Sequence, residues 1–380
     1  MKKKLLGLLL VLVMVMTACG PQTQTQEEGD TILIGGIGPL TGPVSTYGVT
    51  SMNAAKMAIA EINAQGGILG KQVKFLLEDD KGDNTEALNA YNKLVDQGVV
   101  AILGTITSGP SAAIAPATKE DNMPMVTPTG TQLNITQGNP NYFRVCFTDP
   151  FQGEILAQYV KEEGYQTVAV LRNNSQEYSD GVASAFVSKA KELGLDIVAE
   201  ESYSEGDADY RVQLSNLKQI NPDVLLIPDY YETNALILNQ AHEVGLESKI
   251  IGGDGWDGIL TQINTGEEDL VEDVVFSNHY SLDDPDENIQ KFISNYREEY
   301  NGDPSAFSAL SYDGVYLLKQ AIEEAASTDR QAIIDALKAS DFSGITGNLT
   351  FDDNNNPIKV VSMIQVKDGA YKLERLIEIK

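Results

Sequence analysis

The feature that most constrains the fold is a regular alternation of short apolar runs with segments of helical periodicity. Apolar runs at 31–37, 73–77 and 99–103 have the length of strands and are too short for ordinary helices. Between the first two runs, the apolar residues from 52 to 62 recur every three or four positions, which places them on one face of a helix. Such alternation predicts a parallel sheet with helices on both faces.

The same pattern restarts after residue 149, which predicts a second α/β unit of similar size. This unit is expected to have helices at 151–163, 183–193, 210–219 and 235–243 and strands at 168–171, 197–199, 224–227 and 249–252. The C-terminal part is expected to have helices at 289–300, 312–326 and 331–339 and strands at 347–351, 360–366 and 373–379. A chain of 380 residues is long enough for about two such domains.

The charge balance excludes two classes of partner. The chain carries 27 Lys and Arg against 55 Asp and Glu, a formal net charge of −28. Nucleic-acid binding needs basic side chains that displace counterions, and adsorption to anionic lipid needs the same sign of charge. Attachment to a membrane would therefore require a separate anchor.

The first thirty residues contain a candidate export signal and membrane anchor. A basic segment at 2–4 precedes the apolar run 5–16, whose twelve residues would reach about 18 Å as a helix, short of the roughly 30 Å of a bilayer core. Residues 1–18 are therefore predicted to be a secretory signal peptide. Residues 16–19 resemble a bacterial lipobox, although Leu is usual where Met16 stands, and the alternative is an ordinary cleavage site with an incidental Cys19.

The resemblance to a lipobox implies that Cys19 carries lipid and that the polar residues 19–30 form a flexible tether. The folded part would then lie at the extracytoplasmic face of the cell membrane.

Several chemistries lack the residues they need. The only other cysteine is Cys146, so no disulfide or thiolate metal site is expected, and the two histidines, His242 and His279, have no neighbouring partners in sequence. The acidic stretches 79–80 and 352–357 are expected to be an exposed loop and a solvated turn, since the second lacks the Gly and Glu of a calcium loop. We expect no metal, no cofactor and no enzymatic activity.

The residues that remain are polar and aromatic loops between strands and helices. In open α/β sheets such loops, at the carboxyl ends of the strands, form the ligand crevice. They are residues 39–48, 104–109, 127–131, 173–178, 229–231 and 253–256.

In these loops the chain resembles the leucine/isoleucine/valine-binding family, the substrate-binding proteins of ABC importers with the type I periplasmic-binding-protein fold. The resemblance runs from about Ile32 to the end of the chain, and its most telling stretches are 38–48, 62–70, 104–108 and 223–239.

The resemblance implies an α/β fold of two doubly wound parallel-sheet lobes joined by three hinge crossovers. Lobe 1 would comprise 31–148 and 278–352, and lobe 2 would comprise 149–277 and 353–380.

The resemblance also implies how an amino acid would be held. Ser108 and Thr131 match positions that hold the α-carboxylate, the main-chain carbonyl of Thr129 matches one that meets the α-ammonium, and Asp254 matches an acidic residue opposite that ammonium. An anion at Ser108 agrees with its expected place at a helix start, with Pro110 in the first turn. Asp254 is shorter than the Glu of some members, so a water could intervene.

Six further positions match residues that line the cleft or contact the ligand side chain. They are Tyr47, Tyr178 and Tyr230 for the cleft, and Ile106, Thr107 and Phe307 for the side chain. Simpler roles stay open: Ser108 and Thr131 as helix caps, Asp254 as a turn residue, and Tyr178 and Tyr230 as core tyrosines.

The expected function is a lipid-anchored, monomeric receptor that binds a small amino acid, of the branched-chain type, and delivers it to an ABC permease and ATPase complex. A receptor of the same fold that senses an amide, an aromatic acid or another small organic acid is an alternative. An enzyme would require His242 or His279 beside Ser108.

Overall fold

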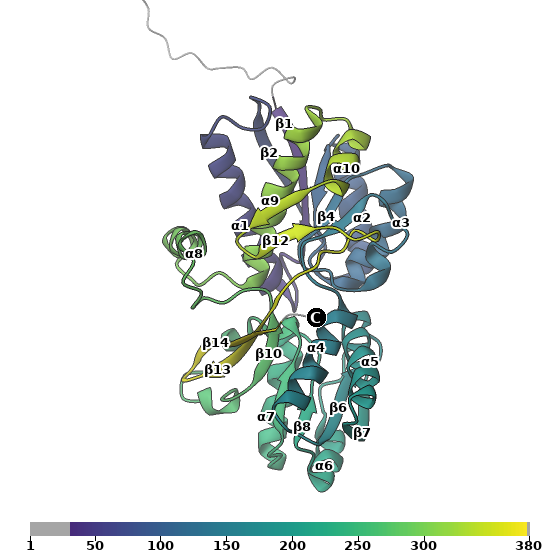
Figure 1. Ribbon diagram of the computed structural model, residues 1–380, viewed down its shortest axis with the longest axis vertical. Helices are drawn as coiled ribbons and strands as arrows, with labels where there is room; N and C mark the ends of the chain where they lie inside the picture. The colour runs from purple at the N-terminus through teal and green to yellow at the C-terminus, as the bar shows by residue number, and fades with distance from the viewer. Residues whose placement is uncertain (1–30, 378–380) are drawn as a thin grey trace, which may run out of the picture.

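Two separate β-sheets, each flanked by helices, organise the molecule into two lobes (Figure 1). The computed structural model describes residues 31–377. The expected signal peptide at 1–18, Cys19 and its tether, and residues 378–380 lie outside the described residues.

The first sheet is parallel throughout, with strand order β2-β1-β3-β4-β5. Its central residues, such as Ile34 and Leu103, are fully buried, as expected for strands covered on both faces. Its elements are β1 (Thr31–Gly38), α1 (Ser45–Ala64), β2 (Gln72–Asp79), α2 (Asn84–Asp96), β3 (Ala101–Leu103), α3 (Ser108–Glu120), β4 (Met125–Thr127) and β5 (Tyr142–Arg144).

The second sheet has the order β14-β13-β10-β9-β8-β6-β7. Its elements are α4 (Asp149–Glu162), β6 (Thr167–Asn173), α5 (Glu177–Glu192), β7 (Asp196–Tyr203), α6 (Arg211–Ile220), β8 (Val224–Leu226), α7 (Tyr231–Val244), β9 (Lys249–Gly252), β10 (Val275–Asn278), β13 (Val361–Lys367) and β14 (Ala370–Ile377). Strands β6 to β10 are parallel, which confirms the expected architecture for most of this sheet.

The second sheet has an antiparallel edge. Strand β13 runs antiparallel to β10, and β14 runs antiparallel to β13. Strands β13 and β14 are joined by the two-residue connection Asp368-Gly369, in which both residues have positive φ (51° and 70°). Such a turn joins antiparallel neighbours, whereas a parallel pair needs a long crossover.

The remaining elements return to the first lobe (Figure 1). They are α8 (Glu287–Tyr300), α9 (Ala306–Ala325), α10 (Arg330–Lys338), β11 (Asp341–Gly344) and β12 (Gly347–Thr350). Helix α9 packs along α1, and the Tyr300 hydroxyl of α8 donates to the Asn53 carbonyl at 2.9 Å.

Three chain segments connect the lobes, and they contact one another. They follow β5, β10 and β12. The Phe147 ring in the first stacks on the His279 ring in the second, with centroids 3.8 Å apart. Lys359 Nζ in the third donates to the Val145 carbonyl at 3.0 Å and to Thr346 Oγ1 at 2.7 Å. Burial lowers the pKa of Lys359 to about 8. The crossovers therefore form one packed hinge.

Two expectations of solvent exposure are wrong in part: Asp79 is half-buried and residues 352–354 are exposed, but their neighbours are buried. Asp80 is fully buried, and burial raises the pKa of its carboxyl to about 7. Asn355, in the turn 352–357, is also buried, and its Nδ2 donates to the carbonyls of Asn139 and Tyr142 at 3.0 and 3.1 Å. Both are polar side chains that are buried in the folded protein. The local sequence does not predict this burial.

Among residues 31–377, no helix is both long enough and apolar enough to cross a bilayer.

Arg144 provides a test of how the first lobe is held together. Its buried guanidinium donates to the carbonyls of Gly130 and Gln132 at 2.6 and 2.7 Å and to Thr136 Oγ1 at 2.9 Å. Arg144→Met leaves these acceptors unpaired and should lower the free energy of unfolding by about 3 kcal/mol, measured by urea denaturation.

The control is Arg297→Met, which removes an exposed guanidinium bonded to Asp303. It should change the free energy by less than about 0.5 kcal/mol. Equal effects of the two substitutions would contradict the structural role of Arg144.

Candidate functional site

Four of the six expected crevice loops, 39–48, 104–109, 173–178 and 229–231, line one cleft, whereas 127–131 and 253–256 are buried and are not part of its lining. Of the ten predicted site residues, nine are at least nine-tenths buried and Tyr230 is partly buried. The nine are Tyr47, Ile106, Thr107, Ser108, Thr129, Thr131, Tyr178, Asp254 and Phe307. Their contacts define three groups: a helix start, a buried carboxylate and an aromatic wall.

The helix start belongs to α3, which begins at Ser108. Its N-cap residue, Thr107, makes no capping hydrogen bond with its side chain, and Thr107 Oγ1 is buried without a partner. Ser108 Oγ accepts from the Thr131 amide at 3.2 Å and lies 3.2 Å from Thr131 Oγ1. Thr129 Oγ1 donates to the Ile106 carbonyl at 2.5 Å. These bonds tie the two loops together beside uncapped amides that favour an anion.

The buried carboxylate is Asp254, which follows β9 in the second lobe. Its main-chain amide donates to Gln152 Oε1 at 3.1 Å, and its Oδ2 lies 3.0 Å from His279 Nε2. Its Oδ1 is buried and has no hydrogen-bond partner. One oxygen of this carboxylate is therefore held and the other is available.

His279 and Asp149 are part of this region but were not among the predicted site residues. Asp149 is the first residue of α4; its Oδ2 is buried without a partner, and burial raises the pKa of its carboxyl to about 7. The nearby charge of Asp254 raises it further, while a hydrogen bond with Thr131 opposes the shift. In the sequence Asp149 has the pattern of an ordinary helix start, and His279 stands alone, so neither signals its partner.

The aromatic wall spans both lobes. The Tyr178 and Tyr230 rings of the second lobe are stacked with centroids 5.1 Å apart. Tyr47 of α1 lies 5.6 Å from the Tyr230 ring and 4.5 Å from the Phe307 ring. The Tyr47 hydroxyl donates to the Gly255 carbonyl. The two lobes are thus in direct contact through Tyr47.

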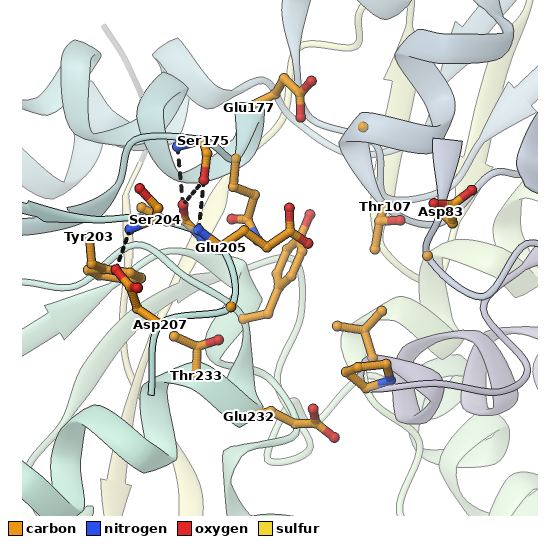
Figure 2. Close-up of a pocket in the computed structure, with 18 of the residues that line it drawn as sticks. Asp83, Thr107, Ser175, Glu177, Tyr203, Ser204, Glu205, Asp207, Glu232 and Thr233 are labelled. Carbon is orange, nitrogen blue, oxygen red and sulfur yellow. Dashed lines mark hydrogen bonds between the residues drawn. The ribbon is translucent and has the colours of Figure 1, made fainter. Parts of the chain in front are cut away.

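A cleft of about 760 Å³ leads from solvent to this region, with Thr107 and Tyr230 in its lining. Figure 2 shows Glu177, Glu205 and Glu232 on one side of it and Asp83 on the other. Lys81 is the one cationic side chain in the lining. The mouth of the cleft is therefore acidic, which disfavours the approach of anions.

The arrangement does not bring a histidine to Ser108. Among the hydrogen bonds of residues 31–377, the Ser108 hydroxyl contacts Thr131, and His279 contacts Asp254. His242 is exposed on α7. The same residues contain no group of three His, Cys, Asp or Glu side chains placed to hold a metal ion.

Comparisons with known proteins agree with the fold. Residues 31–370 match the model of a periplasmic binding protein family. A Leu/Ile/Val-binding protein of Rhizobium johnstonii is 32% identical over 86% of this chain and 88% of its own.

Two solved structures match with a TM-score of 0.85. One is a leucine-binding protein of Thermotoga maritima, 36% identical, with 91% of this chain and 99% of that chain covered. The other is a branched-chain amino acid substrate-binding protein of Streptococcus pneumoniae in complex with isoleucine, 33% identical, with 91% and 98% covered.

The buried Asp149 carboxyl predicts a specific dependence of stability on pH. Because its pKa is raised from 3.8 to about 7, the folded protein binds a proton between these values that the unfolded chain does not, so this group lowers stability as pH rises through that window. Asp149→Asn removes the effect. The variant should gain stability relative to wild type as pH increases from 4 to 7, by about 1.4 kcal/mol for each pKa unit of the shift, measured by urea denaturation.

Asp353→Asn, at an exposed position, serves as the control and should follow the wild-type profile. A difference between Asp149→Asn and wild type that stays constant across this pH range would contradict the assignment.

Proposed function

Because the chain belongs to the periplasmic binding protein family, we propose that it is the extracytoplasmic receptor of an ABC importer and binds a branched-chain amino acid between its two lobes. The ligand would then pass to a membrane permease coupled to an ATPase. The names of the relatives that bind leucine, isoleucine and valine support this substrate class. The receptor role needs no catalytic residue.

The observation that carries the proposal is a buried carboxylate oxygen without a partner in one lobe and an uncapped helix start in the other. The uncapped amides of α3, with Ser108 and Thr131, are suited to the ligand carboxylate. Asp254, with one free buried oxygen, is suited to the ammonium, and the Thr129 carbonyl would add a second acceptor. A zwitterion loses strong hydration on burial, so each charge needs such a partner.

Energetics supports a role for both charged groups. Burying an aliphatic side chain contributes about 1.5–3 kcal/mol. A micromolar dissociation constant requires about 8 kcal/mol in total. The apolar wall formed by Ile106, Phe307 and the tyrosines would therefore supply only part of the binding, and the charged ends would supply the rest.

The same charges argue against the alternative ligand class. An aromatic acid or another organic anion lacks the ammonium that Asp254 requires, and it would approach through an acidic mouth. A neutral amide would leave the Asp254 carboxylate without a countercharge.

Ligand entry requires the lobes to separate about the three crossovers and ligand burial requires them to close. We propose the first boundary between 148 and 149. The second, expected between 277 and 278, we propose directly after Asn278, because Asn278 pairs with Ser362 in the second sheet. The third, expected between 352 and 353, we propose between Asn356 and Val361, because Asn355 is hydrogen-bonded to the first lobe and β13 belongs to the second sheet.

Residues 1–18 would direct export, and lipid on Cys19 would anchor a protein whose acidic body has no affinity of its own for anionic membranes. The receptor is expected to act as a monomer, since one chain contains both halves of the site.

Binding of L-leucine, L-isoleucine and L-valine to the mature protein tests the proposal. Isothermal titration calorimetry should give dissociation constants in the micromolar range or below for at least one of them. Asp254→Asn removes the charge opposite the ammonium and should weaken binding about 100-fold. Asp353→Asn should leave it unchanged. Tighter binding of benzoate than of any amino acid, or full affinity in Asp254→Asn, would contradict the proposal.

The anchor is tested separately in the full-length chain. Cys19→Ser should move the protein from the membrane fraction to the soluble fraction, because it removes the site of lipid attachment. Cys146→Ser, which changes the only other cysteine, should leave the protein in the membrane fraction. Retention of the Cys19→Ser variant in the membrane would show that Cys19 is not the anchor.

A further inference from the structure

We propose that His279 is a positioning residue for the ligand's ammonium group: its Nε2–H holds one oxygen of Asp254 and thereby presents the other to the ligand. This inference rests on the proposed function, since it concerns how the same site recognises an amino acid.

His279 contacts the Asp254 carboxylate, so its proposed effect on the ligand is indirect. His279 Nε2 and Asp254 Oδ2 are 3.0 Å apart, and the two side chains are 0% and 2% exposed. Asp254 Oδ1, the other oxygen, has no partner. A carboxylate fixed through one oxygen has less freedom to lose when its second oxygen accepts a bond from an ammonium.

The hydrogen-bond pattern also assigns the imidazole tautomer. Nδ1 of His279 is buried without a partner. An orphaned N–H donor is rarer in buried positions than an under-used acceptor, so the proton belongs on Nε2, where it is donated to Asp254. Burial lowers the pKa of His279, and hydrogen bonding to Asp254 opposes the shift. A neutral imidazole leaves the negative charge of Asp254 available to the ligand.

The ring is held by the hinge. It stacks on Phe147 at 3.8 Å with an angle of 22° between the planes, and Phe147 lies in the first crossover. His279 itself directly follows β10, in the second crossover, and its amide donates to Asn278 Oδ1 at 2.9 Å. Asp254, in contrast, belongs to the loop after β9. The pair therefore joins the ammonium-binding group to the segments about which the lobes move.

Protonation of His279 would compensate the charge of Asp254 and weaken binding of an ammonium. Other titratable groups near the pair are Asp149 on α4, Cys146 in the first crossover, Lys359 in the third, and Asp257 after Asp254. These groups titrate both in wild type and in a variant at position 279. The ratio of the wild-type affinity to the variant affinity for L-leucine therefore reports the contribution of the His279 imidazole.

The first experiment compares His279→Leu with His279→Gln by calorimetry with L-leucine at pH 7.5. Leu removes the donor and should weaken binding about tenfold or more, the effect of losing a hydrogen bond to a charged group. Gln keeps an N–H donor at a similar distance and should stay within about threefold of wild type. Urea denaturation of each variant shows whether it is folded.

The second experiment does not depend on a variant that folds. The chain has two histidines, so protein labelled with ¹⁵N-histidine gives two imidazole spin systems, and exposed His242 serves as the internal reference. Two-bond ¹H–¹⁵N correlation spectra should show the Nε2–H tautomer for His279, with shifts on addition of L-leucine that His242 lacks.

The pH profile separates positioning from a purely structural role. Because burial lowers the pKa of His279 from its ordinary value of 6.5, the affinity of wild type for L-leucine should fall relative to His279→Gln only at pH values below 6.5. A pH-independent ratio, a protonated Nδ1 in the neutral ring, or full affinity in His279→Leu would overturn the inference while leaving the proposed function intact. Failure of wild type to bind any amino acid would overturn the proposed function, and this inference with it.

Discussion

The structure depends on one electrostatic constraint: a buried carboxylate, Asp254, whose free oxygen has no partner in the protein. A charge buried in this way is costly unless a counterion is supplied. The uncapped start of α3 presents the opposite sign of potential from the other lobe. A zwitterion satisfies both groups at once, whereas a molecule with a single charge satisfies one of them. Under the proposed function, this complementarity would account for the selection of an amino acid.

The aromatic side chains hold the loops that carry the two charged groups in a fixed arrangement. Tyr47 reaches from α1 to the Gly255 carbonyl of the second lobe, so one hydrogen bond joins the two lobes beside the proposed site. Tyr178 accepts from the Gly255 amide at 2.9 Å and stacks on Tyr230, which keeps the loop that follows Asp254 in place. The Phe147–His279 stack packs the first two crossovers against each other next to this region.

The sequence predicted the parts of the fold that repeat over many residues and missed those decided by distant partners. The periodicity of α1 and the long apolar runs of β1 and β2 identified the α/β architecture. Strands β4 and β5 have three residues each and were not predicted, although β3 and β8, which are equally short, were predicted because each lies in a longer uninterrupted apolar run. The antiparallel pairing of β14 with β13 follows from a two-residue turn that the strand pattern does not encode.

The residues of the site show the same contrast between features encoded locally and features decided by distant partners. Loops between strands and helices can be located from sequence, and the ten expected residues follow from a family resemblance concentrated in those loops. Asp149 and His279 were not predicted because each is influenced by Asp254, which is distant from both of them in the sequence. A helix-start aspartate and an isolated histidine have no local pattern that separates them from structural residues.

A crystal structure of the mature protein with L-leucine tests the central claim most directly. The account predicts the ammonium within hydrogen-bond distance of Asp254 Oδ1 and the carboxylate on the amides of Ser108 and Thr131, with the His279–Asp254 pair retained. A ligand bound with its charges reversed, or bound away from Asp254, would contradict it.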